Sequence, residues 1–266
     1  MGAGALPVGE HRRRPPIPIV PVDAGASAAA LARGVGDVAA WLAGVAGGRP
    51  PTRPARVIRV GADGAAAPGE AAVVQLDAPV AGRDPALGPA MSVGEVALAV
   101  DAGRDIAARA AADGVAVLVG TAPAADHAPA TAALTAHLTG VAPPDGGPGA
   151  RALALHGAEI TGPLGALRRL GTGPIAVLCG VALGAGERGL GFAAHGIAAA
   201  AAAALAAGVE PAVRARLIAG EVPGDPVHRA LLAHLRVPVV REGTAAGAAA
   251  LAAALDRLAA ELPGGA

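Results

Sequence analysis

The spacing of apolar residues predicts a first helix over residues 28–45. Its apolar side chains recur at intervals of three and four residues, as on one face of an amphipathic helix: Leu31, Val35, Val38 and Leu42. The Gly- and Pro-rich segment 47–54 ends this helix. The preceding residues 1–26 contain several prolines and no alternating pattern, so we expect them to form a flexible or extended arm.

Short apolar runs bounded by Gly and Pro predict strands at residues 57–60 and 73–76. Ser92 and Glu95 then stand three residues apart at the start of a helical pattern, which is the spacing of a capping box. The helix they open should continue to Asp113 and stop at Gly114.

A continuous apolar run over residues 115–119 is typical of a buried parallel strand, and a second apolar run covers residues 152–155. Helical segments separate and follow these runs: 129–138, 163–170, 175–185, 197–207, 226–235 and 245–262. The alternation predicts an α/β fold with a Rossmann-like parallel sheet flanked by Ala-rich helices. We expect one domain over residues 27–266, in which the N- and C-terminal helices form a small second subdomain.

The amino-acid composition argues against several classes of function. The chain has 266 residues and is 53% apolar, which is sufficient for a large core, but only 1% of its residues are aromatic. Its 21 basic and 21 acidic side chains cancel without forming a basic stripe, so nucleic-acid binding is not expected. A single cysteine excludes an intramolecular disulfide and is compatible with a reducing, cytoplasmic location. The Ala- and Gly-rich run 189–209 is too weakly hydrophobic to predict a membrane span.

Most local motifs carry little information. Residues 184–189 match the glycine pattern of dinucleotide-binding proteins, yet a chain with 40 glycines matches it by chance, so a nicotinamide-cofactor protein is a weak alternative. The scattered histidines predict no metal site, and neither serine lies in a nucleophile elbow. Asp126 and His127 follow the strand at 115–119, where ligands bind in parallel sheets; they are either ligand-binding residues or a solvated loop pair.

Several blocks in the same order along the chain resemble one enzyme family. Three segments are similar to parts of the nicotinate-nucleotide:dimethylbenzimidazole phosphoribosyltransferase family: 37–51 to its N-terminal helix and the following turn, 60–64 to its A-G-D-H-G motif, and 90–107 to the helix before its central strand. The resemblance extends from Trp41 over most of the chain. It implies a phosphoribosyltransferase that transfers phosphoribose from nicotinate mononucleotide to 5,6-dimethylbenzimidazole in cobalamin biosynthesis.

The resemblance also implies substrate-binding residues. The segment 120–134 aligns with the family's G-E/D-M-G-I-G-N-T-T-P-A-A-A-L loop and helix, whose backbone N–H groups approach the nucleotide phosphate. This implies substrate contacts from Gly120, Thr121 and Asp126. Segment 170–176 resembles G-G-x-E-I-A, with Pro174 in place of Glu, and adds Gly171 and Gly173.

The candidate catalytic base comes from a third block. Glu242, Gly243 and Thr244 resemble the family's G-E-G-T-G-A, which implies that Glu242 removes a proton from the benzimidazole while Gly243 and Thr244 bind substrate. Apolar walls would raise the pKa of such a carboxyl group toward a useful value. The alternative is that Glu242 only stabilises the N-terminus of the helix at 245–262.

The resemblance implies small-molecule partners, a nucleotide and a heterocyclic base, and a possible homodimer, with no cofactor and no metal. Some positions depart from the family pattern: Thr121 replaces an acidic residue, Pro123 replaces a glycine, and the segment 65–72 is shorter than the family's. By these departures the chain resembles a shortened and diverged member of the family. They also leave open an alternative to the enzyme, namely a degenerate, non-catalytic paralogue that acts as a binding or interaction protein.

Overall fold

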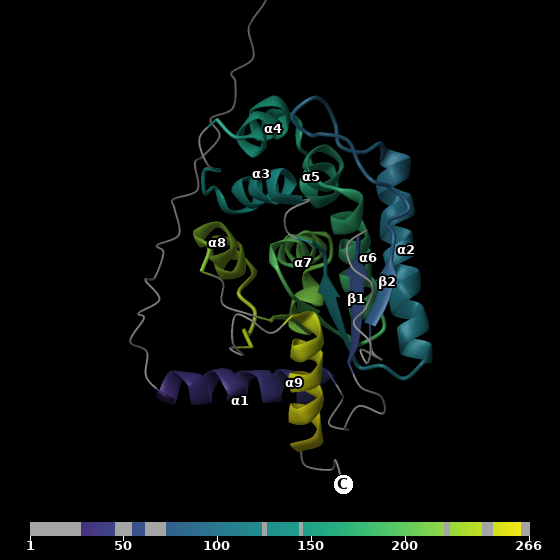
Figure 1. Ribbon diagram of the computed structural model, residues 1–266, viewed down its shortest axis with the longest axis vertical. Helices are drawn as coiled ribbons and strands as arrows, with labels where there is room; N and C mark the ends of the chain where they lie inside the picture. Colours follow the sequence, from purple (N-terminus) through teal and green to yellow (C-terminus); the bar gives the residue numbers. More distant parts are fainter. Residues whose placement is uncertain are drawn as a thin grey trace, which may run out of the picture.

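The computed structural model describes residues 28–45, 55–61, 73–123, 127–143, 146–220, 224–240 and 247–261 (Figure 1). The predicted arm over residues 1–26 lies outside the described residues, as does the short segment 65–72. Within the described part, a parallel sheet is surrounded by helices, which confirms the predicted α/β class.

Five parallel strands form the sheet in the order β2-β1-β3-β4-β5. Their bounds are β1 Arg56–Val60, β2 Val73–Leu76, β3 Val117–Thr121, β4 Gly191–Ala194 and β5 Leu217–Ala219. The register pairs Val57 with Val119, and Val119 with Ala193, so the three central strands are aligned at their carboxyl ends. These strands are short and almost fully buried, as expected when helices cover both faces.

One face of the sheet carries the larger core. Alternate side chains such as Ile58, Leu118 and Phe192 pack against helices α2 (Val93–Ala112), α6 (Gly173–Glu187) and α7 (Ile197–Val209). Beyond this layer lie α3 (Ala128–Thr139), α4 (Pro148–His156), α5 (Gly162–Leu170) and α8 (Pro226–Leu235), as Figure 1 shows. The short 3-10 helix η2 (Gly157–Glu159) follows α4, and a second, η3 (Pro211–Arg216), contacts α6 and α7 and leads into β5.

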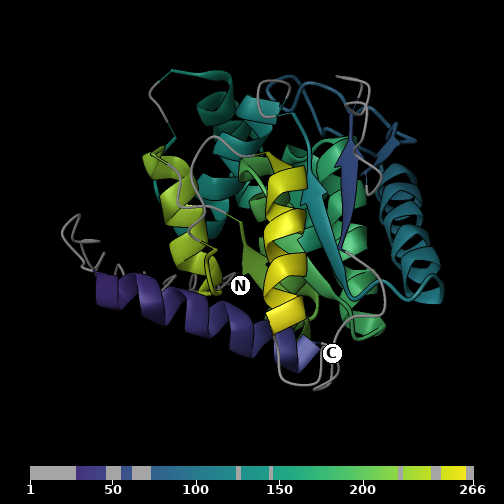
Figure 2. The same cartoon turned by 60° about the horizontal axis from the view of Figure 1, so that its bottom comes forward.

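The other face carries α9 (Ala248–Glu261), which lies along the strands, and α1 (Ala28–Val45) crosses below one end of the sheet, as Figure 2 shows. Trp41 and Leu255 from these helices share a second core with Val119 and Ile218 of the sheet. A hydrogen bond of 2.7 Å from the Ala55 backbone N–H to Asp256 Oδ1 ties α9 to the start of β1. The two terminal helices, predicted to form a small second subdomain, therefore lie together, and both share their core with the sheet.

The helix pattern of the sequence is confirmed closely, but one apolar run was misinterpreted. Residues 152–155, expected to continue the strand and helix alternation, belong to helix α4, because Pro148 begins a helical turn there and only Ala152 of the run is fully buried. The strand expected at residues 115–119 is β3, which begins two residues later at Val117. In the described part of the chain, no helix is both long and apolar enough to cross a membrane.

Glycines let α2 and α6 approach closely. A Cβ added to Gly103 would overlap the Val177 carbonyl oxygen, and one added to Gly180 would overlap that of Val100. The glycine pattern at residues 184–189 lies at the C-terminal end of α6 and not at a turn from strand to helix. Gly184 lies against the backbone of Arg104 and Gly186 against Val213, so these glycines serve packing and the dinucleotide-binding alternative is wrong.

Candidate active site

The order of the strands places a crevice beside β1. The chain passes from β1 to β2 on one side and then to β3 on the other, so neighbouring connections leave this point in opposite directions. Ligands of open parallel sheets bind at such a switch point, outside the carboxyl ends of the strands. Gly61 follows β1 and Asp77 follows β2 at this edge.

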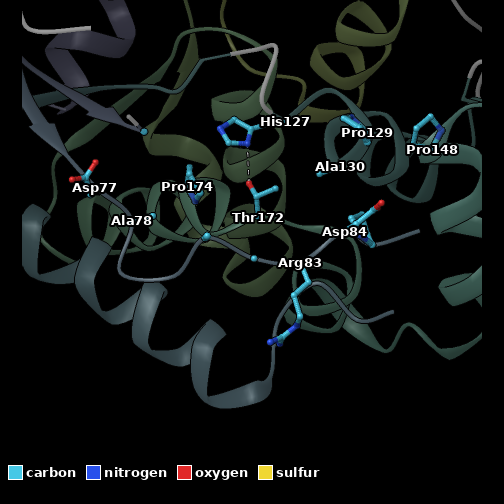
Figure 3. Close-up of a pocket in the computed structure, with 14 residues that line it drawn as sticks. Asp77, Ala78, Arg83, Asp84, His127, Pro129, Ala130, Pro148, Thr172 and Pro174 are labelled. Carbon is cyan, nitrogen blue, oxygen red and sulfur yellow. Dashed lines mark hydrogen bonds between the residues drawn. The ribbon is translucent and has the colours of Figure 1, made fainter. Parts of the chain in front are cut away.

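A pocket of about 560 Å³ opens at this switch point (Figure 3). This volume lies within the range of cofactor and small-ligand sites. Most of its wall is formed by small or rigid residues from loops and helix starts. The lining residues are Gly61, Asp77, Ala78, Ala81, Gly82, Arg83, Asp84, Pro85, His127, Pro129, Ala130, Pro148, Thr172 and Pro174.

Three helices begin at this pocket. Pro129, Pro148 and Pro174 stand in the first turns of α3, α4 and α6, and all three line the pocket. None of the three N-cap residues, His127, Gly147 and Thr172, makes a side-chain cap hydrogen bond within the described part of the chain. Helix N-termini carry partial positive charge, so their convergence favours an anionic ligand.

His127 and Thr172 lie side by side in the pocket wall. The Thr172 hydroxyl and His127 Nδ1 are 3.2 Å apart and share a hydrogen bond, which Figure 3 shows as a dashed line. His127 is only 5% exposed. The interpretation of His127 as part of a solvated loop pair is therefore wrong, because its ring is buried and lines the pocket. Asp126 lies outside the described residues.

The loop over residues 77–91 forms one rim of the pocket and is held by long-range hydrogen bonds. The backbone N–H of Gly173 donates to the Ala81 carbonyl (3.2 Å), and that of Ala90 donates to the Arg169 carbonyl (3.3 Å). His156, buried on α4, bonds through Nε2 to the Pro85 carbonyl at 3.0 Å. The rim therefore depends on contacts with α4, α5 and α6 and not on a local turn alone.

Two charged side chains of this rim interact with residues outside the pocket. Arg83 forms an ion pair of 2.7 Å with Glu95, and Asp84 accepts a hydrogen bond of 2.8 Å from the Ala86 N–H. Hydrogen bonds from Ser92, first from its backbone and then from its side chain, lower the pKa of Glu95, and Arg83 adds to the effect. Ser92 and Glu95 make the predicted capping box at the start of α2.

The structure explains three of the predicted substrate-binding glycines by packing. A Cβ on Gly120 would overlap the ring of Phe192, and one on Gly171 would stand 2.5 Å from the Leu167 carbonyl oxygen. A Cβ on Gly173 would overlap the carbonyl of Val80 in the rim loop. Gly171 and Gly173 nevertheless flank Thr172 of the pocket, whereas Gly120 and Thr121 end the central strand β3. Their contacts with substrate stay predictions.

The remaining predicted site residues, Glu242, Gly243 and Thr244, lie outside the described residues. Sequence reasoning missed most of the pocket wall, including Asp77, Ala81 and Pro148. One usable signal was present, since Gly61 and Asp77 directly follow the two predicted strands at 57–60 and 73–76. No group of three or more side chains suited to a metal ion occurs among the described residues.

Comparisons with known proteins point to one enzyme family. Residues 149–262 match the family model described as "Phosphoribosyltransferase". The nicotinate-nucleotide–dimethylbenzimidazole phosphoribosyltransferase of Pseudomonas putida KT2440 is 35% identical over 196 residues, which are 66% of this chain and 56% of the relative. The enzyme of the same name from Azotobacter vinelandii is 37% identical over 161 residues, 54% of this chain and 46% of the relative.

A solved structure extends the likeness to almost the whole chain. The nicotinate-nucleotide–dimethylbenzimidazole phosphoribosyltransferase from Thermus thermophilus has a TM-score of 0.70 and 26% identity, covering 86% of this chain and 88% of the other. The chain belongs to this phosphoribosyltransferase family. In sequence, however, the match spans only about half the length of the curated relatives.

Proposed function

We propose that this member of the phosphoribosyltransferase family transfers phosphoribose from nicotinate mononucleotide to 5,6-dimethylbenzimidazole and releases nicotinate. The observation that supports the proposal is the pocket of about 560 Å³ at the switch point, on which three helix N-termini converge. Such a site suits a nucleotide with one phosphate together with a second, flat and largely apolar base.

The wall of the pocket fits the rings. Ala78, Ala81 and Ala130 leave space, while the prolines present flat apolar faces at fixed angles. Since the chain has no tyrosine, and its one phenylalanine and one tryptophan are buried in the core, these faces replace aromatic stacking. The positive helix ends would hold the phosphate and thereby fix the ribose between the departing and the attacking ring.

The reaction needs one proton transfer. A ring nitrogen of dimethylbenzimidazole attacks C1′ as the bond from C1′ to the nicotinate nitrogen breaks, and the leaving nicotinate keeps the electron pair of that bond. The second ring nitrogen loses its proton to a base. We propose Glu242 as this base, on the resemblance of residues 242–244 to the family pattern.

Release of nicotinate from the nucleotide in the presence of dimethylbenzimidazole tests the reaction. If Glu242 is the base, Glu242→Gln should lower kcat by about 10²- to 10⁴-fold with little change in the Kd of the nucleotide. Glu210→Gln is the matched control, because Glu210 caps η3 and does not line the pocket. Unchanged kcat in Glu242→Gln would remove the assigned role and leave a helix N-terminal acid.

The same assay decides between an enzyme and a non-catalytic paralogue. Nucleotide binding without any nicotinate release would identify a binding protein with degraded active-site motifs, an alternative that no observation favours at present. The homodimer, a cytoplasmic location and the absence of nucleic-acid partners stay predictions. The mass of the chain in solution tests the first of these.

A further inference from the structure

The inner wall of the pocket contains one pair of polar side chains, His127 and Thr172, which does not belong to the rim loop. Asp77, Arg83 and Asp84 are exposed at the rim, and the last two are engaged with Glu95 and Ala86. His127, by contrast, is buried, and Thr172 is half-buried beside it. The rest of the lining is Gly, Ala and Pro.

This pair joins two helix starts. His127 is the N-cap residue of α3 and Thr172 is that of α6, so their hydrogen bond of 3.2 Å connects the ends that attract an anion. An imidazole ring in this place can donate a hydrogen bond to phosphate, and such bonds to charged groups are stronger than neutral ones. The hydrogen bond to Thr172, which is half-buried, also fixes the plane of the ring.

The residues that precede His127 supply a reason for the imidazole. In the family pattern quoted above, the position of His127 is a threonine, and Pro123 and Ala125 stand where the pattern has glycines. Proline has no N–H group, and neither residue permits the free backbone conformations of glycine. A side-chain donor at residue 127 would therefore replace the backbone donor that the loop lacks at Pro123.

We infer that His127 binds the phosphate of the nucleotide and that Thr172 is a positioning residue that holds the His127 ring. The inference rests on the proposed function for the identity of the nucleotide. It assigns phosphate selectivity to a residue that differs from the family pattern, so it concerns this chain in particular.

Calorimetric titration with two ligands tests the inference: nicotinate mononucleotide and nicotinate riboside, which lacks the phosphate. His127→Ala should weaken nucleotide binding about tenfold or more and leave riboside binding unchanged, because only the nucleotide loses a charge-assisted hydrogen bond. His127→Gln, which keeps a donor, should recover part of the loss. Thr172→Val should weaken nucleotide binding by a smaller factor and alter the ring nitrogen shifts of His127 in nuclear magnetic resonance.

Two variants serve as matched controls. His137→Ala removes a half-buried histidine later in α3, and Thr161→Val removes the exposed N-cap threonine of α5, outside the pocket. Both should keep the wild-type ratio of the two affinities, and thermal unfolding should show that every variant is folded.

Three results would overturn the inference: equal losses for nucleotide and riboside, no loss in His127→Ala, or a wild-type chain that does not distinguish the two ligands. The binding experiment contains no dimethylbenzimidazole and is independent of turnover. A wild-type chain that binds the nucleotide selectively but releases no nicotinate would overturn the proposed function alone. Normal turnover with unchanged selectivity in His127→Ala would overturn this inference alone.

Discussion

The interface between α2 and α6 and the candidate active site are both built from small residues. In the interface these residues allow close packing, whereas in the site they surround a cavity. In the interface, Gly103 and Gly180 have no side chain, so two helix backbones come into direct contact. In the pocket, Ala78, Ala81 and several prolines surround a space of about 560 Å³. A chain with 40 glycines and 24 prolines thus uses small residues both to close gaps and to keep one open.

The difference lies in what surrounds each small residue. In α6 every residue from Gly173 to Ala185 is buried, because helices and strands enclose it on all sides, and an added methyl group there has no room. Two of the pocket alanines, Ala78 and Ala81, belong to the rim loop 77–91, which is anchored to α4, α5 and α6 and is thereby held away from the opposite wall. Substitutions that add volume should therefore affect stability in one region and ligand binding in the other.

The largest effect is expected at the helix interface. Gly103→Ala would place its Cβ against the Val177 carbonyl oxygen, so α2 and α6 would have to separate and lose buried contacts. We expect a loss of about 3 kcal/mol in the free energy of unfolding, at the upper end of overpacking effects. Urea denaturation measures it.

Gly94→Ala is the matched control for this substitution. Gly94 lies in the same helix, where an added Cβ would meet nothing within 4 Å, so the substitution should be neutral or stabilise by up to ~1 kcal/mol. Similar losses in both variants would mean that helix propensity, and not close contact with α6, decides the outcome.

A smaller effect, on binding rather than stability, is expected in the pocket. Ala81→Leu adds a branched apolar group to an exposed lining position, so it should weaken nucleotide affinity about tenfold, which is about 1.4 kcal/mol. The free energy of unfolding should stay within ~0.5 kcal/mol of the wild-type value. Ala97→Leu, at an exposed position of α2 outside the pocket, should change neither quantity. Unchanged affinity in Ala81→Leu would show that this wall does not contact the nucleotide.

The sequence predicted those elements whose signals are local. The helix over 28–45 and the strand over 73–76 have the expected bounds, because apolar spacing and flanking Gly and Pro residues define both. The strands β4 and β5 were not found from the pattern, since Gly191–Ala194 and Leu217–Ala219 are too short to stand out. These segments form strands because of their pairing with neighbouring strands in the sheet and not because of their local sequence.

The candidate site was predicted less completely, because its wall is assembled from distant segments. Ala81 meets Gly173 and Pro85 meets His156 only through long-range hydrogen bonds, which no spacing in the sequence reveals. His127 was singled out because it follows a predicted strand, but its partner Thr172 lies 45 positions away. Resemblance supplied the family, whereas the residues of the pocket required the structure.

The smallest effect concerns the junction between the two regions, where Arg83 of the rim meets Glu95 in the first turn of α2. Hydrogen bonds from Ser92 and Arg83 lower the pKa of Glu95 below its usual 4.5, so its contribution to stability is present above that pH and is lost as pH falls through the folded-state pKa. Glu95→Gln should therefore lower the urea midpoint slightly at pH 7 and leave it unchanged in strong acid. The effect at pH 7 should be smaller than that of Ser92→Ala, which removes the N-cap itself.

The control is Asp105→Asn, which changes an exposed carboxylate later in α2 and should leave the midpoint unchanged at both pH values. If Glu95→Gln also weakens nucleotide binding at pH 7, the rim and the helix act as one unit, and the separation of stability from binding drawn above does not hold at their junction.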